Sequence, residues 1–170
     1  MSEVTRRSVK TGIGFGLIAG IIFAVGEVVL ALAMGMPALE PFRMFASVVF
    51  GAGALEFGPW AALIGGGIVH LVLAGLFGLI YGLINTRLPL EAHTNAGTQT
   101  VLGLVFGAAI WILNFQIIAR VAYPWFLDLP QFMQFLLHAV LFGVPLGLLY
   151  AAAERRSVIA QGVRRQPQAA

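Results

Sequence analysis

Residues 11–34 read TGIGFGLIAGIIFAVGEVVLALAM, a stretch of 24 residues in which Glu27 is the only charged side chain. A helix needs about 20 mostly apolar residues to cross the roughly 30 Å hydrocarbon core of a bilayer. The apolar residues run continuously and do not alternate with polar ones, which favours an α-helix over a strand of a membrane barrel. The stretch therefore predicts a transmembrane helix.

Three further stretches have the same character, at 59–84, 97–121 and 131–153. Of the 170 residues, 59% are hydrophobic and 10% are charged, whereas soluble proteins are about 45–50% apolar and about 25% charged. This composition excludes a soluble globular domain, and the absence of cysteine excludes a disulfide-stabilised scaffold. The sequence predicts an all-α integral membrane protein, a four-helix bundle with four spans.

The segments outside the spans are assigned by length and composition. Residues 43–57 contain an apolar run that is too short to cross, flanked by Pro41 and Pro59, so they predict one short interfacial or re-entrant helix. Residues 1–10 form an N-terminal segment. We expect the tail, residues 154–170, to be disordered because it carries little apolar surface to bury.

The basic residues predict the orientation of the spans. Of the ten Lys and Arg residues, only Arg43 and Arg120 fall on one side of a four-span arrangement. The other eight lie in the two termini and in the loop at 85–96, which places these segments in the cytoplasm and the protein in a bacterial inner membrane. The positive charge reflects this topology, and no basic helix with interleaved aromatic residues indicates nucleic-acid binding.

The chain contains an internal repeat. GLIAG at 16–20 matches GLVFG at 103–107, and HLVLAG at 70–75 matches HAVLFG at 138–143. Without any gap, the first match also aligns Glu27 with Asn114 and Pro37 with Pro124. The second match aligns Tyr81 with Tyr150 when one residue is inserted in the second half. Because each half contains two spans, the predicted repeat is parallel, with its pseudo-twofold axis along the membrane normal.

Small residues recur at four-residue spacing in the spans, as in GxxxG patterns that allow close helix packing. Glu27 and Asn114 fall on the same helix face as these small residues, and so does His70. With His138, they predict one polar layer inside the bundle, in the middle to outer part of the bilayer. Four further polar residues are secondary candidates: Arg43, Gln116, Arg120 and Gln134.

A carboxylate at mid-membrane costs about 2.5–3.5 kcal/mol on insertion scales, so Glu27 must pair, bind a proton or face water. Three roles stay open for it: a structural hydrogen bond, with His70 or Asn114 as the expected partner; a proton or cation relay; and a substrate contact. Arg43 and Arg120 are the candidate counter-charges if Glu27 is ionised.

The two aligned histidines, His70 and His138, raise the alternative of a b-type haem held between two helices of the bundle. No CxxCH attachment motif supports it, and a metal ion would need Glu27 as a third ligand. Sequence signatures of soluble enzymes are missing as well, including GxSxG, the P-loop and HExxH, so we expect no enzyme and no resident cofactor.

Three short motifs carry a resemblance: PFRM at 41–44, Asn114-Phe115, and YPWF at 123–126. They resemble a family of small four-helix bacterial inner-membrane proteins of unknown function. The resemblance covers most of the chain and implies a fold and a location, without any catalytic residue.

These observations favour a small transporter or permeation protein with a polar intramembrane layer. A non-catalytic accessory or assembly subunit of a membrane complex is the first alternative, and a haem- or quinone-binding redox subunit is the second. The expected partners are the lipid bilayer and either further copies of the chain or subunits of a membrane complex.

Overall fold

The structure, a computed structural model, describes the backbone of residues 3–165 and the side chains of residues 10–158. Between residues 3 and 165 every regular element is helical. Four helices are long and apolar enough to cross a membrane, as the sequence predicts: Lys10–Ala33, Pro59–Asn85, Ala96–Ala122 and Gln131–Val158. This arrangement is compatible with a multi-pass membrane protein, in which each span satisfies its own backbone hydrogen bonds.

The first span belongs to one continuous helix, α1 (Glu3–Ala33), whereas a π-helical turn interrupts each of the other three. The second span consists of α3 (Pro59–Ala61), the π-turn η2 (Ala62–Gly66) and α4 (Gly67–Asn85). The third consists of α6 (Ala96–Trp111), the π-turn η3 (Ile112–Ile118) and α7 (Ala119–Ala122). The fourth consists of α8 (Gln131–Leu136), the π-turn η5 (Leu137–Gly143) and α9 (Val144–Arg165). Single π-turns inside α-helices occur frequently at functional sites.

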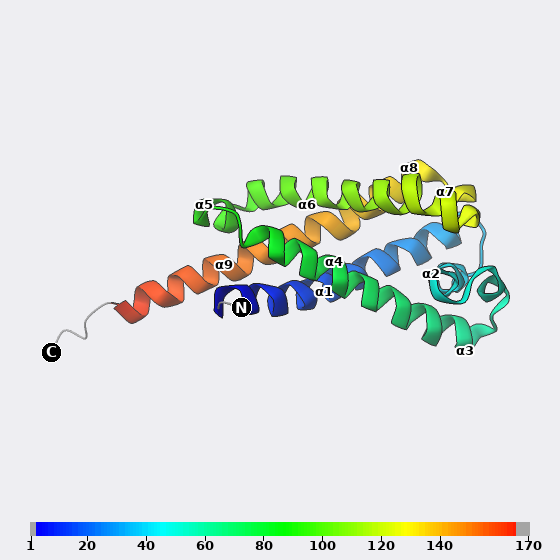
Figure 1. Ribbon diagram of the computed structural model, residues 1–170, viewed down its shortest axis with the longest axis horizontal. Coiled ribbons are helices and arrows are strands. Elements are labelled where there is room, and N and C mark those ends of the chain that lie inside the picture. Colours follow the sequence, from blue (N-terminus) through cyan, green and yellow to red (C-terminus); the bar gives the residue numbers. More distant parts are fainter. Residues whose placement is uncertain (1–2, 166–170) are drawn as a thin grey trace.

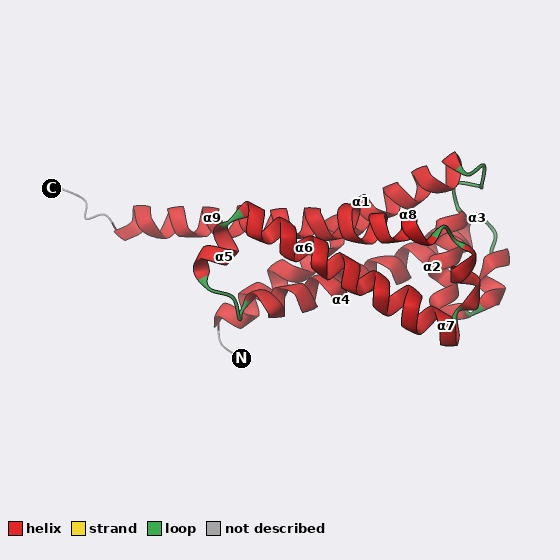
Figure 2. Ribbon diagram, turned by 90° about the horizontal axis from the view of Figure 1, so that it is seen from above, coloured by secondary structure: helices red, strands yellow, loops and turns green. Residues whose placement is uncertain are grey.

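Both chain termini lie at the same end of the bundle, which we call the terminal end (Figure 1). The short helix α5 (Leu90–Thr94), in the loop between the second and third spans, lies there as well. The opposite end, the α2 end, holds α2 (Glu40–Phe50) and the 3₁₀ turn η4 (Pro124–Asp128), and the view turned by 90° agrees (Figure 2).

The prediction of a single short helix over residues 43–57 is wrong. The segment contains α2 and a separate 3₁₀ turn, η1 (Ala52–Glu56), and α2 begins three residues before the expected start. The break falls at Gly51, whose φ of 72° is in the left-handed region that favours glycine. Pro41 stands in the first turn of α2, where a missing N–H costs nothing.

The predicted disordered tail is also wrong for residues 154–165, which continue α9 as a helix beyond the fourth span. Ala151, Ala152 and Ala153 followed by Glu154 and two arginines are good helix formers, and the last turns of the span extend into them. Residues 166–170 lie outside the described residues. At the other terminus, α1 begins at Glu3, within the segment assigned to the N-terminus.

The helices pack as two close pairs, α1 along α4 and α6 along η5 and α9. A Cβ added to Gly16 would lie 2.7 Å from the Cα of Gly78 and would also meet the Ala74 carbonyl. A Cβ added to Gly103 would likewise meet the carbonyl of Gly143. Glycine is therefore needed where these backbones touch. Contacts of α1 with η5 and α9 join the two pairs.

Candidate functional site

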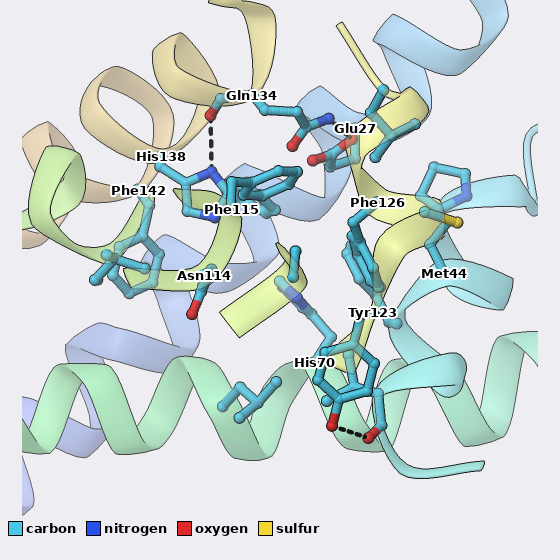
Figure 3. Close-up of a pocket in the computed structure, with 18 of the residues that line it drawn as sticks. Glu27, Met44, His70, Asn114, Phe115, Tyr123, Phe126, Gln134, His138 and Phe142 are labelled. Carbon is cyan, nitrogen blue, oxygen red and sulfur yellow. Dashed lines mark hydrogen bonds between the residues drawn. The ribbon is translucent and has the colours of Figure 1, made fainter. Parts of the chain in front are cut away.

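A cavity of about 480 Å³ lies inside the bundle, in the half toward the α2 end. All four spans contribute to its wall, and so do α2 and η4. Most of the lining side chains are apolar or aromatic. The four residues of the predicted polar layer, Glu27, His70, Asn114 and His138, all line this cavity together with Gln134 (Figure 3).

Glu27 projects from α1 into the cavity wall and is only 8% exposed. Its Oε2 accepts a hydrogen bond of 3.1 Å from Nε2 of Gln134, which is 1% exposed on α8. The expectation that His70 or Asn114 would be this hydrogen-bond partner is wrong. Gln134, a secondary candidate in the sequence, therefore belongs to the centre of the site.

The two basic residues near this end are engaged elsewhere. Arg43 forms an ion pair of 3.0 Å with Glu40 and donates from Nε to the Phe57 carbonyl at 2.9 Å. Arg120 is exposed and donates to Oε1 of Gln116 at 2.7 Å. Neither lines the cavity, so the expected counter-charges of Glu27 are not at the site. Among residues 10–158, no Lys or Arg contributes to the wall of the cavity.

His138 is buried in the π-turn η5 and stands edge-on to two rings, Phe23 at 4.7 Å and Phe115 at 5.6 Å between centroids. Its Nδ1 lies 2.7 Å from the Gln134 carbonyl oxygen of its own helix. A carbonyl oxygen only accepts, so Nδ1 donates, and in the neutral imidazole Nε2 keeps its lone pair. Gln134 thus links Glu27, through its side chain, with His138, through its backbone (Figure 3).

His70 on α4 has the opposite tautomer. Its Nε2 lies 2.8 Å from the Gly20 carbonyl oxygen of α1, so Nε2 donates and Nδ1 keeps the lone pair. The ring is stacked between two phenylalanines, with centroid distances of 4.4 Å to Phe45 and 5.6 Å to Phe23. These contacts hold the imidazole in place between α1 and α2.

These residues do not fit the haem alternative. Phe23 contacts both imidazoles, on the face of His70 and on the edge of His138, so a phenyl ring occupies the space between them. Nε2 of His70, the nitrogen that usually binds haem iron, already donates a hydrogen bond to the Gly20 carbonyl. Within residues 10–158, no group of three His, Asp or Glu side chains is placed to hold a metal ion.

Asn114 lies in the π-turn η3 and lines the cavity from the side of the third span. Within residues 10–158 its side-chain amide makes no hydrogen bond, and the residue is half-buried in a mostly apolar wall. Figure 3 shows its amide turned toward α4, away from Gln134. The amide therefore offers a free donor and a free acceptor to an occupant of the cavity.

The α2 end of the cavity is closed by contacts between α2 and the loop around η4. Tyr123 donates to the Val48 carbonyl at 3.0 Å, and Nε1 of Trp125 donates to Oγ of buried Ser47 at 2.9 Å. An aromatic cluster such as Tyr123–Phe126 is typical of a membrane interface. In the structure Tyr123 and Phe126 also line the cavity.

Toward the terminal end, a buried polar network lies beyond the cavity. The Tyr81 hydroxyl donates to Oε1 of Gln99 at 2.7 Å, and Nε2 of Gln99 donates to Oδ1 of Asn85 at 2.7 Å. Sequence reasoning missed all three residues. Their signal was available, because Asn85 and Gln99 are amides at the ends of apolar runs where a polar side chain needs a partner.

Comparisons with known proteins give no relative: no protein-family model, curated protein or solved structure matches this chain. The function is therefore inferred from the cavity and its side chains.

Proposed function

We propose that this chain is a small membrane protein of the transporter or permeation class, and that the cavity around Glu27 is its substrate site. One observation supports the proposal above the others. A carboxyl group faces a cavity at membrane depth, its described protein partner is the neutral Gln134, and no described Lys or Arg lines the wall. Ionisable residues inside spans are costly and typically mark ion or substrate pathways.

The charge of Glu27 must be compensated when it is ionised, because a buried carboxylate without a counter-charge is costly. A proton or a cation entering the cavity supplies this compensation. The other titratable groups on the wall are His70, His138, Glu40 and Tyr123, and Glu40 is already paired with Arg43. We assign Glu27 as the group that alternates between proton and cargo.

The proposal includes the parallel repeat and the membrane orientation. A Cβ on Gly16 would meet the backbone of Gly78, and a Cβ on Gly103 would meet the backbone of Gly147, the residue aligned with Gly78. These contacts occupy comparable places in the two helix pairs and support a repeat packed through GxxxG-type stripes. We place both termini in the cytoplasm and the protein in a bacterial inner membrane, because the basic residues favour the terminal end.

Proton movement in proteoliposomes tests the proposal. With a pH gradient imposed across the membrane and a trapped pH-sensitive dye, we expect wild-type protein to dissipate the gradient faster than protein-free liposomes. Glu27→Gln retains the shape and removes the charge, and it should abolish this flux. Glu56→Gln, a carboxyl outside the cavity, is the matched control and should keep it. Wild-type flux in Glu27→Gln would refute the role of Glu27.

A further inference from the structure

We infer that the substrate of the cavity is a lipophilic organic cation that reaches Glu27 sideways, from the hydrocarbon between the second and third spans. The inference rests on the proposed function, since it assigns a substrate class to the same site. Three features of the cavity wall support the inference: its polar atoms are mostly hydrogen-bond acceptors, it contains many aromatic rings, and one of its sides is exposed.

The polar atoms that face the cavity are mostly acceptors. The Glu27 carboxyl presents oxygen, and the lone pairs of His138 Nε2 and His70 Nδ1 are left over from their hydrogen bonds to carbonyls. Asn114 contributes a free amide donor. An anionic headgroup would meet this wall without any described Lys or Arg to bind it. A cation in the same cavity would instead face the Glu27 carboxylate and several hydrogen-bond acceptors, so the wall favours a cation.

The apolar wall is rich in aromatic rings. Phe23 and Phe45 cover both faces of His70, while Phe115 stands edge-on to Phe126 with 5.9 Å between centroids. A cation over an aromatic face is attracted by the ring quadrupole, and most strongly in a desolvated site. The volume of about 480 Å³ falls within the range of roughly 300–1,000 Å³ that is typical for drug-sized ligands.

The cavity has an exposed side between α4 and the third span. The two spans meet toward the terminal end, where Tyr81 packs on Phe106 with 5.1 Å between centroids, and α4 runs away from α6 toward the α2 end (Figure 1). Leu76 on α4 and Leu113 on η3 line the cavity while remaining 48% and 42% exposed. In a bilayer these side chains contact lipid, so this opening admits molecules that dissolve in hydrocarbon.

Binding of two isosteric ions tests the inference. Tetraphenylphosphonium and tetraphenylborate have nearly the same shape and opposite charge. In calorimetric titrations of the purified protein, with protein-free detergent as the blank, we expect tetraphenylphosphonium to bind and tetraphenylborate not to bind. Equal affinities for the two ions would overturn the inference, and this comparison uses the wild-type protein alone.

Two sets of variants test separately the charge of Glu27 and the entry route between the second and third spans. Glu27→Gln should weaken tetraphenylphosphonium binding at least about thirtyfold, as expected when one partner of a desolvated charge pair is removed. Ile80→Trp fills the exposed side from α4 and should reduce binding, whereas Val72→Trp, on the same helix but away from the cavity, should not. Unchanged binding in Glu27→Gln, or equal effects of the two tryptophans, would contradict the assigned site or route.

The outcomes distinguish this inference from the proposed function. Glu27-dependent binding of tetraphenylphosphonium without flux in proteoliposomes would retain the substrate class and refute a transport role. Glu27-dependent proton flux without binding of the phosphonium, and without competition by it, would refute the lipophilic cation and retain the proposed function.

Discussion

Replacing Gly16 by alanine tests the close packing of α1 on α4. The new Cβ would lie 2.7 Å from the Gly78 Cα, about 0.7 Å inside ordinary contact, and would also meet the Ala74 carbonyl. Both obstacles are backbone atoms, so the helices must separate, and overpacking of this kind costs about 1–3 kcal/mol. The gain in helix propensity from glycine to alanine offsets about 0.5–1 kcal/mol of that cost.

We expect a net loss of about 1–2 kcal/mol, which lowers the melting temperature of a chain of this size by roughly 2–8 °C. The measurement is thermal unfolding of the detergent-purified protein followed by circular dichroism. Gly14→Ala, in the same helix, is the matched control, because a Cβ at Gly14 meets nothing within 4 Å. It should keep or raise the melting temperature. If Gly16→Ala and Gly14→Ala have the same melting temperature, the close contact of α1 with α4 is refuted.

The remaining predictions concern the orientation, the buried network and the closure at the α2 end. Because the chain has no cysteine, Glu56→Cys should react with an impermeant maleimide in intact cells, and Arg156→Cys only after permeabilisation; the reverse pattern would invert the topology. Gln99→Leu should destabilise the protein by about 1–3 kcal/mol, because the Tyr81 hydroxyl and Oδ1 of Asn85 lose their hydrogen bonds to the Gln99 side chain, while Thr98→Leu, on the exposed side, should have little effect. Trp125→Phe should lower stability by about 0.5–1.5 kcal/mol through the lost bond to Ser47, and Trp60→Phe, which is 75% exposed, is its control; equal melting temperatures would count against the closure.

The spans were predictable because their signal is strong and local. The predicted stretch at 59–84 differs from the observed helical span by one residue, and the stretch at 97–121 by one residue at each end. Long apolar runs bounded by Pro, Gly and charged residues leave little freedom in a chain that must satisfy every backbone group in lipid. The polar residues were predictable as a set for the same reason, since each is costly outside the bundle.

The break in the short outer segment was harder to predict. Gly51, Gly53 and Gly58 all interrupt the apolar run, and the sequence does not indicate which of them takes the left-handed conformation. In the structure Gly51 takes it, at the end of a helix, α2, that packs against η2. A Cβ on Gly66 of η2 would collide with the Phe42 backbone, so this packing depends on a tertiary contact that no local pattern contains.

The partner of Glu27 was not predictable, because the face of a helix was assigned by counting 3.6 residues per turn. That count fails where a π-turn adds a residue, and both Asn114 and His138 lie in π-turns. From His70 to Gly78 is eight residues, and from His138 to Gly147 is nine. The π-turn η5 overlaps the longer stretch from His138 to Gly143 and accommodates the additional residue, while Gly147 still reaches α6.

The same extra residue explains why two aligned histidines are used differently. His70 sits in regular helix and points across to the Gly20 carbonyl of the neighbouring span, whereas His138 sits in the widened turn and bonds the Gln134 carbonyl of its own helix. The two imidazoles then present different nitrogens to the cavity, and Glu27 has a neutral residue, Asn114, at the position aligned with it. The two helix pairs thereby enclose an asymmetric site, in which Glu27 and Glu40 are the carboxyl groups of the wall and Glu40 is paired with Arg43. Under the proposed function, the one carboxyl group without an ion-pair partner among the described residues, Glu27, compensates one positive charge at a time, as exchange between a proton and a monovalent cation requires.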